Sequence, residues 1–272
     1  MVSERYPDVE LNPPSYSETA VPPDAAPTVR QITTDTVKDC LRKGIEDFRA
    51  QPGFGLFFGG IYFVGGLVLW AVASAFGNSG VLVPLAFAFP LLGPFIAIGL
   101  YEVSRRRAAG EGMSRPAVLG ALFRQRDGQM PFMGVIILFL TLSWLILVRV
   151  TFAIFLSDSA MTNIFSTREA LFTPEGIVML LVVGVMGFAF AVLVFSITVV
   201  SMPMMLEREI DFVTAMITSV QAVTENLKPM AMWAGIVAAT MLVAMLPAFI
   251  GLVIALPVLG HATWHLYKAV VE

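Results

Sequence analysis

The chain alternates between short amphipathic segments and long runs of apolar residues. Three times, a segment with a helix-capping residue at its start ends at a proline, and a charge-free run follows. These segments extend from Asp35 to Pro52, from Ser114 to Pro131 and from Asp211 to Pro229, at intervals of 17, 17 and 18 positions. Each predicts an amphipathic helix on a membrane surface followed by membrane-crossing helices. We therefore expect three repeated units, at about residues 33–104, 113–206 and 209–270.

The apolar runs predict an all-α polytopic transmembrane helical bundle with six spans. Each run approaches the ~20 residues that cross the hydrocarbon core of a bilayer. The expected spans are about Phe54–Phe76, Val81–Val103, Phe132–Leu156, Gly176–Met202, Met230–Leu246 and Ala248–Tyr267. The last two are short, so five spans with one re-entrant segment is the alternative.

The first amphipathic segment has an apolar stripe of Val37, Leu41, Ile45 and Phe48. Before it, residues 1–31 are proline-rich and poor in large apolar side chains, which predicts a disordered tail ahead of a transmembrane domain over residues 32–270. The tail, two connectors and the C-terminal end hold 15 of the 17 Lys and Arg residues. By the positive-inside rule, both termini and the three amphipathic segments should be cytoplasmic.

Composition agrees with this architecture. The chain is 57% hydrophobic and 14% charged, whereas soluble domains are roughly a quarter charged. A net charge of −3 gives no reason to expect a nucleic-acid partner. The single cysteine, Cys40, cannot form an internal disulfide.

The two histidines, His261 and His265, are a candidate metal site. They stand at i and i+4, so they share one face of a helix and could hold one metal ion. The sequence places no carboxylate or cysteine close to them, and the ligand set is incomplete. The other interpretation is a pair of interfacial histidines in an aromatic belt with Trp264 and Tyr267.

Arg149 is the only charged residue inside the third predicted span. An intramembrane arginine is a functional hypothesis by default, here a path for a solute or proton. It could also reach the outer interface by extending its side chain, or pair with Asp158 or Glu175.

Several charges fall where spans meet the cytoplasm. The acids could form interfacial salt links, which is the simpler interpretation, or they could couple to ion movement. The arginine run is typical of a topology signal that also contacts anionic lipid. The acids are Glu102, Glu207 and Glu209, with Arg105 and Arg208 near them, and the arginine run is Arg105, Arg106 and Arg107.

Two motifs, Gly93–Glu102 and Pro257–Tyr267, resemble a family of bacterial inner-membrane proteins of unknown function. Its members are often labelled as cytochrome c oxidase subunit I. The resemblance covers roughly Thr33 to Val270 and implies a six-span protein of the bacterial inner membrane, without active-site residues. A catalytic oxidase subunit needs more haem and copper ligands than two histidines supply, so we do not expect that activity.

These observations leave three hypotheses. The leading one is a non-enzymatic protein in an accessory, assembly or scaffold role beside other membrane complexes, respiratory ones included. Its partners would be the lipid bilayer and other integral membrane proteins or itself, with no cofactor. A small-solute transporter or channel built on the threefold repeat is the second, and a haem or metal carrier using His261 and His265 is the third. We find no phosphate loop, nucleophile motif or zinc-hydrolase motif.

Overall fold

The computed structural model describes residues 27–76, 96–125, 128–161, 172–247 and 249–272. These residues are helical apart from short connections and one isolated β-bridge between Val29 and Val271, which confirms the predicted all-α class. Most of the predicted tail lies outside the described residues. The helices are α1 (Thr34–Ala50), α2 (Pro52–Phe76), α4 (Arg115–Arg124), α5 (Met130–Met161), α7 (Pro174–Thr198), α8 (Ser201–Glu207), α9 (Phe212–Glu225), α10 (Leu227–Met245) and α11 (Leu252–Val270). Residues 96–108 are also helical.

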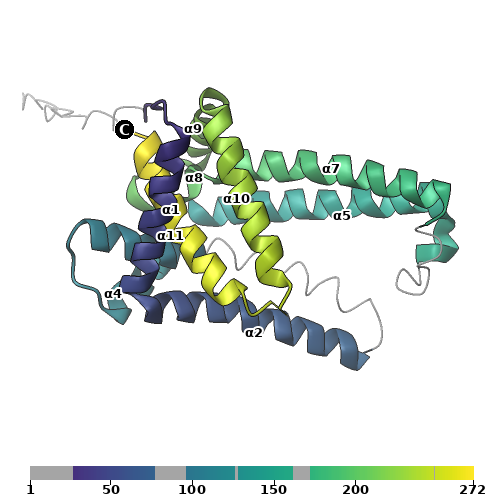
Figure 1. Cartoon of the computed structure of the whole chain (residues 1–272), viewed down its shortest axis with the longest axis horizontal. Coiled ribbons are helices and arrows are strands. Elements are labelled where there is room, and N and C mark those ends of the chain that lie inside the picture. Colours follow the sequence, from purple (N-terminus) through teal and green to yellow (C-terminus); the bar gives the residue numbers. More distant parts are fainter. Residues whose placement is uncertain (1–26, 77–95, 126–127, 162–171, 248) are drawn as a thin grey trace, which may run out of the picture.

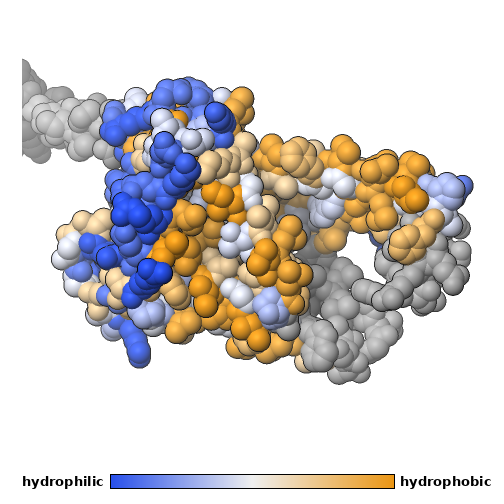
Figure 2. All heavy atoms as spheres, viewed as in Figure 1, coloured by the Kyte–Doolittle hydropathy of each residue, from blue (hydrophilic) through white to orange (hydrophobic). Residues whose placement is uncertain are grey.

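The molecule has a polar end and an apolar body. Figure 1 shows α5 and α7 side by side as a long hairpin that extends away from α1, α8 and α9. In Figure 2 hydrophilic residues gather at the end formed by α1 and its neighbours, and hydrophobic residues cover the hairpin. This separation is the one expected if amphipathic helices lie at a membrane surface and the hairpin crosses the bilayer.

The helix starts follow the predicted capping residues closely. An N-cap side chain accepts a hydrogen bond from a backbone N–H that has no partner within the helix. Such bonds confirm the predicted caps at Ser114 (from Ala117 N, 3.3 Å) and Asp211 (from Thr214 N, 2.9 Å). Thr173 caps α7 in the same way (from Gly176 N, 3.1 Å). The first helix is capped by Thr33, which forms a reciprocal pair with Thr36, and not by the predicted Asp35, which lies in the first turn.

Three described helices are long and apolar enough to cross a membrane: Met130–Phe155, Pro174–Glu207 and Leu227–Met245. A fourth span results only if α1 and α2, which meet at 99°, are counted together. Helix α11 lies outside this set, because His261, His265 and Lys268 lower its hydropathy. The second predicted span lies mostly outside the described residues. Six spans and the threefold repeat therefore remain predictions.

Helices α1 and α11 pack closely against each other in the polar end. A Cβ atom added at Gly44 would lie 2.7 Å from both Ala262 N and Val258 O. The two backbones touch there, and only glycine leaves enough room. This contact fixes the position of α1 across the middle of α11.

The N-terminal segment is held against the C-terminus. Arg30 N donates to Val270 O at 2.8 Å, and Glu272 N donates to Thr28 O at 3.0 Å. The buried Asn226 side chain accepts from Ile32 N at 2.7 Å and donates to Arg30 O at 3.0 Å. Part of the predicted tail is thus ordered, and the junction of α9 and α10 anchors it.

Candidate functional site

Three segments distant in the sequence bring five polar side chains together inside the polar end. Helix α1 contributes Asp47, the helical stretch 96–108 contributes Ser104 and Arg107, and α11 contributes His261 and His265. We call these five residues the Asp47 cluster. Its members lie beside the tight contact of α1 with α11, so that contact positions them.

Asp47 is the centre of the cluster. Its side chain accepts hydrogen bonds from Ser104 Oγ at 2.6 Å and from His265 Nε2 at 2.8 Å, both on Oδ2. Arg107 Nη1 donates to the other carboxylate oxygen, Oδ1. Asp47 is only 4% exposed, and a buried carboxylate is tolerated when its oxygens are hydrogen-bonded and a cation is near.

These contacts set the protonation of Asp47, which stands on α1 at the polar end and outside the three spans. Burial by itself raises the pKa of the carboxyl group, and the hydrogen bonds from His265, Ser104 and Arg107 lower it by more. The net pKa of Asp47 is below its usual value, so the carboxylate is charged at neutral pH.

The hydrogen bonds also define the tautomer of His261. Because the Ser104 hydroxyl donates its proton to Asp47, its oxygen accepts from His261 Nδ1, 2.8 Å away. The Nε2 atom of a neutral His261 then carries a lone pair. Nε2 is buried, and no described residue forms a hydrogen bond with it. Among the described residues, His261 Nε2 is thus a buried basic nitrogen without a hydrogen-bond partner.

The two histidines do not converge on one position. His265 directs Nε2 at Asp47, and His261 directs Nδ1 at Ser104. Within the described residues, no group of three or more His, Cys, Asp or Glu side chains is arranged to hold a metal ion. Trp264 and Tyr267 are buried in the core rather than exposed to lipid, which differs from the aromatic-belt interpretation.

Glu102 lies in a second ionic group on the same helical stretch. It is 1% exposed and accepts from Arg105 Nε at 2.8 Å and from Arg106 Nε at 2.7 Å. Arg105 also contacts Glu111 at 2.8 Å, and this hydrogen bond lowers the pKa of Glu111. With Arg107 bound to Asp47, the whole Arg105–Arg107 run forms ion pairs inside the protein.

The remaining predicted residues lie apart from the Asp47 cluster. Glu207 pairs with Lys268 at 2.9 Å, and Glu209 is exposed. Arg149 is exposed on α5, and Glu175 is exposed at the start of α7. No ion pair between these two is present among the described side chains, which do not include that of Asp158.

The helical, largely apolar architecture agrees with the comparison with known families. Residues 82–207 match a family model described as predicted integral membrane protein (DUF2189). The DUF2189 match confirms the expected resemblance to uncharacterised membrane proteins. It includes the Gly93–Glu102 motif, Ser104 and Arg107, but not α1 or α11. No curated protein and no solved structure matches the chain.

Sequence reasoning missed Asp47 and Ser104. The predicted apolar stripe of α1 was Val37, Leu41, Ile45 and Phe48, of which only Val37 is fully buried. The residues that are buried are Val37, Cys40, Gly44 and Asp47. The buried positions follow helical spacing, so Asp47 continues a buried face. A carboxylate at a position that continues a buried helix face could therefore have pointed to Asp47 from the sequence. Nothing in the sequence marks Ser104.

Proposed function

We propose that this protein is a non-enzymatic integral membrane protein that packs against other membrane proteins in an accessory, assembly or scaffold role. The observation that carries the proposal is the isolation of the α5–α7 hairpin. Within the most apolar windows of these two spans, 6% of the residues are buried in the protein, against 22% in α10. Figure 1 shows how far the hairpin extends from the other helices.

The surface of the hairpin suits another helix. Large apolar side chains are exposed on both helices, including Phe139, Ile146 and Ile154 on α5 and Val185 and Phe188 on α7. A Cβ atom added at Gly134 or Gly184 would have no neighbour within 4 Å. In lipid, helices associate through close packing at small residues rather than through the hydrophobic effect. Open glycines between large side chains therefore support a protein partner.

The polar groups support a structural role over a catalytic one. Asp47, Ser104, Arg107 and His265 are hydrogen-bonded to one another. Glu102 is bound by two arginines. Such satisfied groups hold helices together. A reaction needs a group that is free to contact a substrate, and His261, the member of the cluster with an unpartnered nitrogen, is 0% exposed.

Purification from native membranes in mild detergent, followed by mass spectrometry of proteins that co-elute at near-equal amounts, tests the proposal. We expect a stoichiometric membrane partner that Gly184→Leu releases without loss of protein. Gly60→Leu is the matched control, because Gly60 on α2 also has open space beside it. A homo-oligomer without another protein, unaffected by Gly184→Leu, would reject the proposal and favour transport through the chain's own spans.

A further inference from the structure

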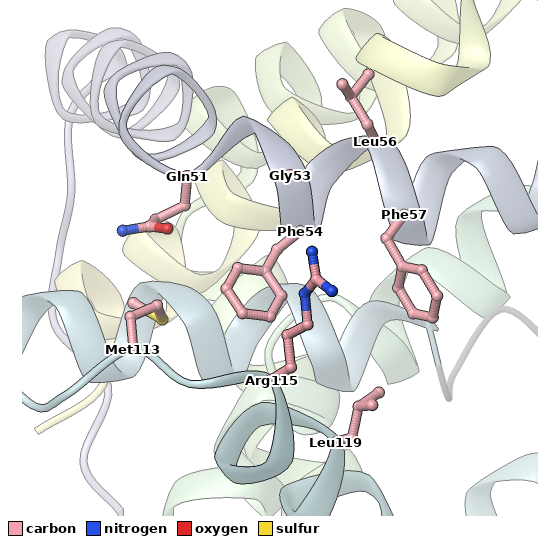
Figure 3. Close-up of a pocket in the computed structure, with 8 residues that line it drawn as sticks. All are labelled: Gln51, Gly53, Phe54, Leu56, Phe57, Met113, Arg115 and Leu119. Carbon is pink, nitrogen blue, oxygen red and sulfur yellow. The ribbon is translucent and has the colours of Figure 1, made fainter.

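A cavity of about 680 Å³ opens between the start of α2 and helix α4 (Figure 3). It lies where the polar end meets the apolar body, because α2 begins directly after α1 at the sharp bend. Gln51, Gly53, Phe54, Leu56 and Phe57 line it from the bend and α2, and Met113, Arg115 and Leu119 line it from α4 and the residues before it.

Arg115 gives the cavity a positive charge. Figure 3 shows its side chain extending from the start of α4 toward α2, between the rings of Phe54 and Phe57. Arg115 makes no ion pair with any described residue, unlike Arg105, Arg106 and Arg107. None of the described residues that line the cavity is acidic, and Gln51 adds an uncharged amide. The site thus favours an anionic group that accepts hydrogen bonds.

The apolar part of the cavity continues onto the outside of α2. Phe57 is 51% exposed, and exposed apolar side chains follow it at helical spacing at Ile61, Val64 and Val68. A ligand whose anionic group contacts Arg115 can therefore lay a long apolar chain along this face. Free phosphate or a small soluble anion would leave the apolar face unused.

We infer that the cavity binds the headgroup and upper acyl chain of an anionic phospholipid. Arg115 donates hydrogen bonds to the phosphate, Gln51 contacts the polar headgroup, and Phe54, Phe57 and Leu119 contact the first methylenes. The site uses other residues than the α5–α7 hairpin, so it stands whether or not that hairpin binds a protein partner.

Native mass spectrometry of the purified full chain tests this inference, with phosphatidylglycerol and phosphatidylcholine of the same acyl chains as probes. Phosphatidylglycerol should bind more tightly, and Arg115→Gln should weaken its binding by about tenfold, the loss of one charged hydrogen bond. Arg124→Gln removes the same charge from the same helix at a residue outside the cavity lining, and should change the affinity by less than about twofold.

Two further arms keep the test decisive. Leu119→Trp fills the cavity and keeps the charge, so it should also weaken phosphatidylglycerol binding. This variant tests the site even if Arg115→Gln fails to fold. Glycerol phosphate should not displace the lipid, because it lacks the chains that lie on α2. The inference is overturned if both lipids bind equally, if Arg115→Gln and Leu119→Trp bind like the wild type, or if glycerol phosphate competes.

Discussion

Asp47 and His265 are 218 positions apart in the sequence, and their side chains meet at 2.8 Å. Asp47 is on α1 and His265 on α11, so this hydrogen bond joins the first and the last helix that the structure describes. Ser104 and Arg107 bring the helical stretch 96–108 to the same carboxylate. One buried acid therefore holds three segments that no local preference would bring together.

Removing the Asp47 carboxylate should destabilise the polar end strongly. Asp47→Ala leaves His265, Ser104 and Arg107 without their common acceptor, and we expect the free energy of unfolding to fall by about 3 kcal/mol. Thermal unfolding of the purified protein in detergent measures this. Asp35→Ala on the same helix is the control, because Asp35 is exposed and its loss should leave the free energy of unfolding nearly unchanged. Equal losses in both variants would contradict the role of Asp47.

The same carboxylate predicts a loss of stability in acid. The folded-state pKa of Asp47 lies below the usual value of 3.8. Its contribution to the free energy of unfolding is therefore complete above pH 3.8 and is lost as the pH falls through the lower, folded-state pKa. The wild type should therefore lose this contribution only below about pH 4. Unfolding measured against pH should show a smaller acid step in Asp47→Asn. An unchanged acid step in this variant would argue against the predicted linkage.

Gly44→Ala should separate α1 from α11. The new methyl group would meet backbone atoms of Val258 and Ala262 at 2.7 Å, and backbone cannot give way as a flexible side chain can. We expect a loss of about 2 kcal/mol, which thermal unfolding would detect. Gly60→Ala, with open space beside it, should be neutral or stabilising by less than about 1 kcal/mol.

Arg149→Leu separates the membrane-partner hypothesis from transport. Arg149 is exposed on α5, where a long side chain can extend its charge toward an interface. We therefore expect normal abundance and unchanged co-purification of partners in the variant. Loss of solute flux in proteoliposomes, with normal protein levels, would instead support a transport path through Arg149.

The hypothesis of a haem or metal carrier makes a direct prediction about purified protein. Because His265 Nε2 and His261 Nδ1 are hydrogen-bonded to different residues, we expect less than one metal ion or haem per chain. Elemental analysis and visible absorption measure this. A stoichiometric cofactor that disappears in His261→Ala would support the carrier hypothesis.

The sequence alone determined the class of this protein and most of its helices. Apolar runs such as Met130–Phe155 exceed the length of a bilayer core, and caps such as Ser114 and Asp211 act on backbone groups only three positions away. These are local properties, so they could be predicted without knowing which helices touch. The two histidines were also identified, because their spacing places them on one helix face.

Only the tertiary structure decided how the polar residues are used. Helix α11 looked like a span with interfacial histidines, but its contact with α1 buries His261 and brings Asp47 to His265. In the run Arg105–Arg107, the pairs of Arg105 and Arg106 with Glu102 follow from i+3 and i+4 spacing on one helix. Only packing brings Arg107 to Asp47. Arg115 forms no ion pair within the described part of the chain and faces a cavity. The periodicity of a helix indicates which of its residues share a buried face. It does not encode how distant helices cross, and this crossing decides which side chains become neighbours.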